Sequence, residues 1–305
     1  MSDAIDPAHV ENASRARALY LESLRPDMSR ADWHATVREA RKLVAMALRV
    51  SRYLKDIAGA LELNCGHGLV FRHLLAPPVS QDQFSLLCES WSKSAENGSK
   101  RIKRPVAKAA EAVILARLDP GRVKWLRTGR APTRLEISTL LTVVATLIAQ
   151  QRMATAGRTA LALEQESAVV TLLEGAGWTK LPSKAIDERA QVPPRHFMRK
   201  TRFAAGPKAH QEVDIACGLP SGYVLAMECK VTNDVTNSVK RLNDVIKKAV
   251  AWKVQWGRTV ITAALLQGVV SPKDVQRLSE HQIEVFWSHD LAAFLAWLVA
   301  RETTS

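Results

Sequence analysis

The sequence has little of what marks several common protein classes. Only four cysteines occur in 305 residues, Cys65, Cys88, Cys217 and Cys229, and none forms a CxxC pair. This argues against a disulfide framework or a cysteine-based zinc site and favours reduced thiols in a cytoplasmic protein. No Walker-type glycine loop is present, which argues against chemistry built on nucleotides.

Long hydrophobic runs are missing as well. The longest, Leu140–Ala149, is interrupted by Thr142 and Thr146, and it is shorter than the roughly 20 residues that a membrane-spanning helix needs. The N-terminal segment is polar and has no apolar signal core. We therefore expect a cytoplasmic protein without a membrane partner.

Acidic residues are outnumbered. The chain has 43 lysines and arginines against 30 aspartates and glutamates, a net charge of +13, which favours an anionic partner, nucleic acid first. After an expected polar linker at Ser94–Ser99, eleven basic residues lie between positions 100 and 134, opposed only by Glu111 and Asp119. This pattern predicts a surface that tracks phosphates, although a merely solvated basic face remains the alternative. The candidates for nucleic-acid contact here are Lys100, Arg101, Lys103, Arg104, Arg127 and Arg130.

Two charges interrupt the apolar stretch Tyr223–Val231, in which seven of nine residues are apolar. The stretch predicts a buried strand, and Glu228 and Lys230 would project from the same face of it because strand side chains alternate. Burying either charge alone is costly, so each needs a partner. An ion pair between the two is the simplest alternative to a functional role.

A second short strand is expected at Glu212–Cys217, and the turn residues Leu219–Gly222 would join the two strands into a hairpin. Asp214 would then reach the point where Glu228 and Lys230 emerge. Two converging carboxylates with an ammonium beside them suit a hard divalent cation.

These residues resemble the active-site signature of the PD-(D/E)xK nuclease superfamily, with Val213 in the place of the proline. The resemblance implies Asp214, Glu228, Lys230 and Glu166 as catalytic residues. It implies Mg²⁺, which Mn²⁺ can replace, held by Asp214, Glu228 and the backbone carbonyl of Cys229. Glu166 occupies the place of a glutamate on the first core helix, expected at Leu163–Gly177, with Glu164 as the alternate and a surface position as the other interpretation.

The helix expected at Asn233–Trp256 begins with a group of polar and basic residues. Helix N-termini bind phosphates well, so this group supplies further candidates for nucleic-acid contact, namely Asn237, Ser238, Lys240 and Arg241. For Lys240, simple exposure to solvent is the other interpretation.

Residues 115–300 are also similar to the XamI-like family of type II restriction endonucleases. The residues that carry the similarity are Gln165–Glu166, Asp214, Glu228–Asn233, Asn237–Ser238, Lys240–Asn243 and Phe286–Leu291. The similarity implies Mg²⁺-dependent, site-specific cleavage of double-stranded DNA, a homodimer, and a cognate DNA methyltransferase in the same system.

The order of expected elements predicts an α/β fold, in which a helical N-terminal region precedes a restriction-endonuclease-like αβα core with a central mixed sheet. We place a mostly helical, basic, DNA-binding region at residues 1–156 and the nuclease core at 157–305. Two other functions remain open: a structure-selective or phage-defence nuclease of the same superfamily, and a basic DNA-binding protein without catalysis.

Overall fold

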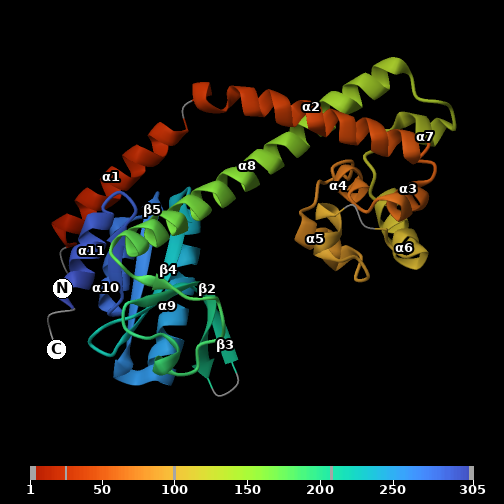
Figure 1. The fold of residues 1–305 in the computed structure, drawn as a ribbon. Helices are drawn as coiled ribbons and strands as arrows, with labels where there is room; N and C mark the ends of the chain where they lie inside the picture. The colour runs from red at the N-terminus through yellow and green to blue at the C-terminus, as the bar shows by residue number, and fades with distance from the viewer. Residues whose placement is uncertain (1–4, 25, 99–100, 207–208, 302–305) are drawn as a thin grey trace. The chain divides into compact units, whose positions relative to one another are not determined.

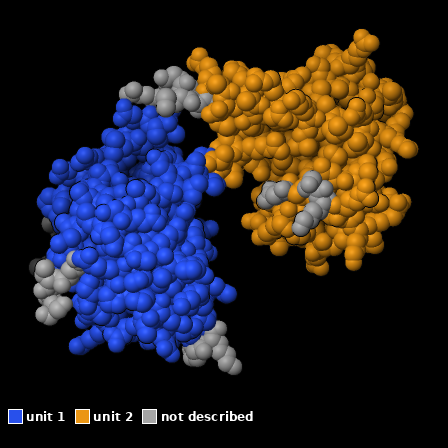
Figure 2. All heavy atoms as spheres, viewed as in Figure 1, with its two compact units in different colours: residues 1–25, 157–305 blue, residues 26–156 orange. Residues whose placement is uncertain are grey.

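The computed structural model describes residues 5–24, 26–98, 101–206 and 209–301, and the chain divides into two compact units. One unit combines residues 1–25 with 157–305, and the other contains residues 26–156 (Figure 2). The predicted assignment of residues 1–25 to the helical region is wrong. Ala13 and Ala16 of α1 (Pro7–Ser23) are buried against the sheet-containing unit, in one core cluster with α9 and α10.

The described residues of the unit 26–156 form helices joined by loops, with one isolated β-bridge between Leu75 and Leu118. Its elements are α2 (Pro26–Val50), α3 (Ile57–Leu63), α4 (His67–Arg72), α5 (Gln81–Leu87), a 3-10 helix η1 (Lys93–Asn97), α6 (Arg104–Leu115), α7 (Lys124–Thr128) and the first part of α8 (Arg134–Gly175). One core holds it together, with Trp125 and Phe71 among its largest buried side chains.

The structure differs from the polar linker expected at Ser94–Ser99, of which Ser99 lies outside the described residues. Glu96 is buried and accepts hydrogen bonds from Arg72 at 2.8 to 3.1 Å. Burying a carboxylate requires such a partner, and the pair fixes η1 to α4.

The helix α8 is longer than the sequence predicted. The sequence placed a helix at Leu163–Gly177 and a domain boundary after residue 156, yet one helix of 42 residues runs across that boundary and through Gly157. Among the described helices, α8 alone is long and apolar enough to cross a membrane, by length and composition only. Its apolar residues pack in protein cores: Val144 and Ile148 in the helical unit, Val169 and Leu173 in the other.

The second unit is a three-layer αβα structure around a six-stranded mixed sheet, as the sequence predicted (Figure 1). The strands lie in chain order: β1 (Thr179–Lys180), β2 (His196–Gly206), β3 (Ala209–Gly218), β4 (Val224–Thr232), β5 (Val260–Gly268) and β6 (Glu284–Trp287). The β2–β3 and β3–β4 pairs are antiparallel, and the other three are parallel. The remaining elements are the 3-10 helices η2 (Arg189–Gln191) and η3 (Gly257–Thr259) and the helices α9 (Val235–Trp256), α10 (Pro272–Glu280) and α11 (Leu291–Ala300).

Two helical layers cover the sheet. The end of α8 and α11 bury one face through Val169, Leu173, Phe294 and Leu298. On the other face lie α9 and α10, and α9 buries an apolar stripe that includes Leu242, Val245, Ala249 and Trp252. Charged side chains inside this sandwich lie between apolar layers, so each of them needs a hydrogen-bonding or oppositely charged partner.

Candidate active site

In the middle of β2 the regular alternation of side chains between the two faces of the sheet is interrupted. Phe197 packs on the α8 side of the sheet, whereas Phe203 packs on the α9 side together with Met198. Side chains of a regular strand alternate, so two odd-numbered residues should share a face. The reversal occurs around Lys200, whose φ of +51° is in the left-handed region that residues other than glycine rarely adopt.

The neighbouring strand β3 reverses at the matching position. Val213 packs on the α9 side and Ile215 on the α8 side, so Asp214 lies at the reversal. The β2–β3 register pairs Arg199 with Ile215 and Thr201 with Val213, which places Lys200 opposite Asp214. The two reversals therefore coincide and turn both charged side chains out of regular alternation.

Asp214 reaches β4 through a gap between the strands. The β3–β4 pairing ends at Ile215 and Met227, and beyond it Cys229 N–H donates to Asp214 Oδ2 at 2.8 Å. The N–H and the C=O of one strand residue point to the same side. The carbonyl of Cys229 therefore faces the same gap as the Asp214 carboxylate.

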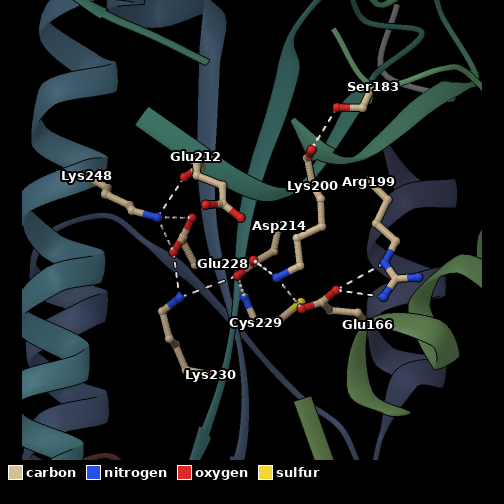
Figure 3. A network of polar contacts seen from close by, with 10 residues as sticks. All are labelled: Glu166, Ser183, Arg199, Lys200, Glu212, Asp214, Glu228, Cys229, Lys230 and Lys248. Atoms are coloured by element: carbon tan, nitrogen blue, oxygen red, sulfur yellow. Dashed lines mark hydrogen bonds and ion pairs between the residues drawn. The ribbon is translucent and has the colours of Figure 1, made fainter. Parts of the chain in front are cut away.

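Lys230 joins the two predicted carboxylates. Its Nζ lies 2.6 Å from Glu228 Oε2 and 3.4 Å from Asp214 Oδ2. The side chains of Asp214, Glu228 and Lys230 therefore lie together, as expected from the sequence (Figure 3). The alternative, a pair of Glu228 and Lys230 alone, does not account for the contact with Asp214.

Glu228 has no exposed surface, and a second lysine also binds it. Lys248 on α9 donates to both Glu228 oxygens at 2.9 and 2.8 Å and to the backbone carbonyl of Glu212 at 2.7 Å. Two ammonium groups thus compensate one buried carboxylate and hold it in position.

Glu166 approaches from the other helical layer. It is buried on α8, and it pairs with Arg199 through Oε2 at 3.0 Å and with Lys200 through Oε1 at 2.7 Å. Lys200 also lies 3.1 Å from Asp214 Oδ1. The alternative of a surface glutamate is therefore wrong, and Glu166 joins the same network as Asp214 (Figure 3).

Asp214 and Lys230 are both charged at neutral pH. Burial raises the pKa of Asp214, but Lys230, the Cys229 N–H and Lys200 outweigh burial and hold that pKa below its ordinary value. Burial lowers the pKa of Lys230, but Glu228 and Asp214 outweigh burial and raise it. Lys230 is therefore an ammonium and not a neutral base. The Cys229 thiol has its pKa raised, first by burial and then by Asp214 and Glu166, so it stays protonated.

An open pocket of about 610 Å³ borders the network on the α9 side. It is lined by Gln211, Glu212, Glu228, Lys230, Arg241, Asp244, Lys247 and Lys248. Lys230, whose side chain is 18% exposed, faces this pocket, whereas Glu228 itself has no exposed surface. The basic residues of the lining suit an anionic ligand.

Comparison with known proteins identifies the family. The model of the XamI restriction endonuclease family matches residues 52–287. The type II restriction enzyme XamI of Xanthomonas campestris pv. amaranthicola is 32% identical over 204 residues, which cover 66% of this chain and 71% of that enzyme. The chain belongs to the XamI restriction endonuclease family. It is thus a type II restriction enzyme, a hydrolase of the endonuclease class.

The match begins earlier than the predicted similarity. Residues 115–300 were expected to carry it, but the family match starts at residue 52 and so includes most of the helical unit. Among solved structures, protein VC1899 from Vibrio cholerae is 11% identical, with a TM-score of 0.31. The alignment covers 87% of this chain and 57% of that chain, and it supports no structural conclusion.

The residues predicted to contact nucleic acid in this family member differ in their surroundings. Lys100 lies outside the described residues. Four of the others in the helical unit are exposed: Arg101, Lys103, Arg104 and Arg127. Arg130 is exposed too, but both of its terminal nitrogens bind Glu136 at 2.7 and 2.5 Å.

At the start of α9, Asn237 and Lys240 are exposed, whereas Ser238 is fully buried and cannot present its hydroxyl to a phosphate in this structure. Arg241 donates to the backbone carbonyl of Val231 at 2.8 Å and lines the pocket beside Lys230. Ser238 is therefore a wrong candidate for direct contact, and Arg241 is held close to the network.

Three network residues were missed by the sequence interpretation, Arg199, Lys200 and Lys248. Lys248 follows Val245 by three residues and precedes Trp252 by four, so it lies on the edge of the apolar stripe of α9. A lysine in register with a buried stripe signals a buried partner. Lys200 leaves a weaker signal, since its position opposite Asp214 depends on the register of β2 and β3.

Proposed function

We propose that this restriction enzyme hydrolyses phosphodiester bonds of double-stranded DNA at a specific sequence, and that the reaction requires Mg²⁺, which Mn²⁺ can replace. The observation that carries the proposal is the meeting of Asp214 and Glu228, from adjacent strands, around one ammonium nitrogen at 3.4 and 2.6 Å. A position that attracts one cation between two carboxylates has the chemistry that a hard divalent cation needs.

The donors fit such a cation. Asp214, Glu228 and the carbonyl of Cys229 supply oxygen only, and all three lie at one edge of the β3–β4 gap. Within the described residues, no group of three or more acidic, histidine or cysteine side chains is already arranged as a metal site. The carboxylates are paired with lysines instead, so a bound cation competes with ammonium groups for the carboxylate oxygens.

When bound, the cation would polarise the scissile phosphate and lower the pKa of the attacking water. Lys230 orients that water and offsets the charge that develops on the phosphorane-like transition state. Its raised pKa keeps it charged for this role. The leaving group is the 3′ oxygen, and Glu166 positions the water or a second ion.

Lys248 prepares the site without touching DNA. By binding both oxygens of Glu228 it fixes the direction of that carboxylate. A ligand held in place before the cation arrives loses little conformational freedom on binding.

The basic helical unit supplies the contacts to the DNA backbone in this proposal. Arg101, Lys103, Arg104 and Arg127 are exposed there, and lysine and arginine displace counterions from phosphates. We further propose a cytoplasmic homodimer, since symmetric subunits suit the cutting of two strands, together with a cognate DNA methyltransferase that protects the host DNA.

Incubation of the purified chain with plasmid DNA of mixed sequence and Mg²⁺ tests the proposal. We expect discrete fragments, no cleavage in EDTA, and recovery on addition of Mn²⁺. Asp214→Ala should abolish cleavage, whereas Glu174→Gln, an exposed carboxylate of α8, should cut like wild type. Cleavage by Asp214→Ala at the wild-type rate, or undiminished cleavage in EDTA, would overturn the proposal.

A further inference from the structure

Lys200 holds together two acidic residues from different layers of the fold. Its ammonium lies 2.7 Å from Glu166 Oε1 on α8 and 3.1 Å from Asp214 Oδ1 on β3 (Figure 3). Neither carboxylate is exposed by more than a tenth of its side chain. Two nearly buried carboxylates that share one cation repel each other strongly when that cation leaves, unless another takes its place.

The backbone is built to keep Lys200 at this position. Its φ of +51° is strained for a residue with a side chain, and Ser183 Oγ donates to the Lys200 carbonyl at 2.7 Å. The left-handed conformation at this residue accompanies the reversal of β2, and it aims the lysine at Asp214 instead of at an apolar layer. Strain of this kind persists where the surroundings enforce it.

Three lysines pair with the carboxylates of the network, and their side chains differ in exposure to solvent. The side chain of Lys230 is 18% exposed and that of Lys248 27%, whereas the side chain of Lys200 is 47% exposed. An ammonium on a flexible four-carbon stem can turn into water where its path is open. Lys200 is therefore the lysine that can leave with the least loss of packing.

The charge of the network favours the departure of one ammonium group when a divalent cation binds. Arg199, Lys200, Lys230 and Lys248 bring four positive charges against three negative ones from Glu166, Asp214 and Glu228. A divalent cation added to this set would leave it at +3, whereas exchange for the Lys200 ammonium leaves it at +2. Like charges a few ångströms apart repel in a site that water enters poorly.

We propose that Lys200 is the internal counter-ion of the cation site, whose ammonium a divalent cation must displace from between Glu166 and Asp214. The inference rests on the proposed function, because it takes Asp214 as a ligand of the cation. Lys200 is then a positioning residue: it holds the two carboxylates in place while the site is free of metal, and it competes with the cation for Asp214 Oδ1.

This competition predicts whether cation binding becomes tighter or weaker when Lys200 is replaced. A competing internal group leaves the site open for only a fraction of the time. The apparent Kd of the external cation is then its intrinsic Kd divided by that fraction. Removal of the ammonium should therefore tighten cation binding, whereas loss of a merely structural lysine would weaken it.

Mn²⁺ binding to the DNA-free full chain, measured by isothermal titration calorimetry, tests the inference. We expect the Kd of Lys200→Met to fall by about tenfold or more, and that of Lys200→Gln to fall as well. Lys200→Arg keeps the charge and should keep the wild-type Kd. Lys180→Met, an exposed lysine of β1, is the matched control and should bind like wild type. Thermal unfolding checks that each variant is folded.

An unchanged or weaker Kd in Lys200→Met and Lys200→Gln would overturn the inference. Asp214→Asn separates this failure from that of the proposed function. If Asp214→Asn abolishes Mn²⁺ binding while the Lys200 variants bind like wild type, only the counter-ion role fails. If Asp214→Asn binds Mn²⁺ as wild type does, the cation site itself has been misplaced and both proposals fail.

Discussion

Lys248 Nζ lies 2.9 and 2.8 Å from the two oxygens of Glu228, a carboxylate with no exposed surface. The lysine comes from α9 and the glutamate from β4, so the pair joins a helical layer to the sheet. Removal of one partner of a buried pair leaves the other charge uncompensated in an apolar environment.

Lys248→Met should therefore lower the free energy of unfolding by about 2 to 3 kcal/mol, less than the full cost of an unpaired buried charge because Lys230 remains beside Glu228. Urea denaturation measures the loss. The matched control is Lys247→Met, an exposed neighbour on the same helix, which should change stability by less than about 0.5 kcal/mol. Equal losses in the two variants would contradict the prediction.

The stability of the sheet-containing unit should depend on the charge of Asp214. Its folded-state pKa lies below the ordinary value of 3.8, so folding favours the carboxylate. The stabilisation is complete above the unfolded pKa and is lost as the pH falls through the folded pKa. In urea denaturation at a series of pH values, the difference between wild type and Asp214→Asn should be constant from pH 7 to about 5 and shrink below about 4. A difference that stays constant down to pH 3 would contradict the lowered pKa.

The helical unit should depend on the buried pair of Arg72 and Glu96, whose side chains are 4% and 2% exposed. Arg72 also donates to the carbonyl of Val79 at 2.7 Å and to Gln151 Oε1 at 3.1 Å. Arg72→Met should cost about 3 to 5 kcal/mol because it leaves the Glu96 carboxyl group buried without its partner. Chemical denaturation followed by tryptophan fluorescence reports the loss, since Trp125 lies in the same core.

A surface pair provides the comparison. Arg104 lies 3.6 Å from Glu62 and is 73% exposed, so Arg104→Met should cost less than about 1 kcal/mol. Similar costs for the two arginine variants would show that the burial of Arg72 has no energetic consequence.

Cys229 should matter through its backbone and not through its thiol. The Asp214 carboxylate accepts from the Cys229 N–H, and the thiol is buried with a raised pKa. Cys229→Ala should therefore cleave DNA and bind Mn²⁺ close to the wild-type level. All four cysteines are buried, so iodoacetamide at pH 8 should modify none in the native chain and all four in urea, as mass spectrometry can count. Inactivation of the native enzyme by alkylation at Cys229 would contradict this.

The hairpin and its three charged residues could be predicted because their signals are local. Apolar runs, the turn at Leu219–Gly222 and the spacing of Glu228 and Lys230 all lie within about twenty residues of chain. The register that brings Asp214 to Cys229 then follows from the hairpin itself.

Lys200 and Lys248 could not be placed in this way, because their partners belong to other elements and the contacts depend on register and on layer packing. The same holds for Glu96, whose partner Arg72 lies 24 residues away. In α8 the error has a different cause. A glycine such as Gly157 costs a helix only about 1 kcal/mol relative to alanine, which is too little to end a helix anchored at both ends by apolar cores.

The coincident reversals of β2 and β3 also bear on how related chains can be searched. A reader who expects unbroken alternation would assign Val213 and Ile215 to one layer, and would then dismiss the aspartate between them as a poorly placed solvent residue. An acidic residue flanked by apolar neighbours that belong to opposite layers is, in this fold, where the chain changes sides in order to present a carboxylate. Divergent sequences that have lost the neighbouring motif can be examined for that change of sides.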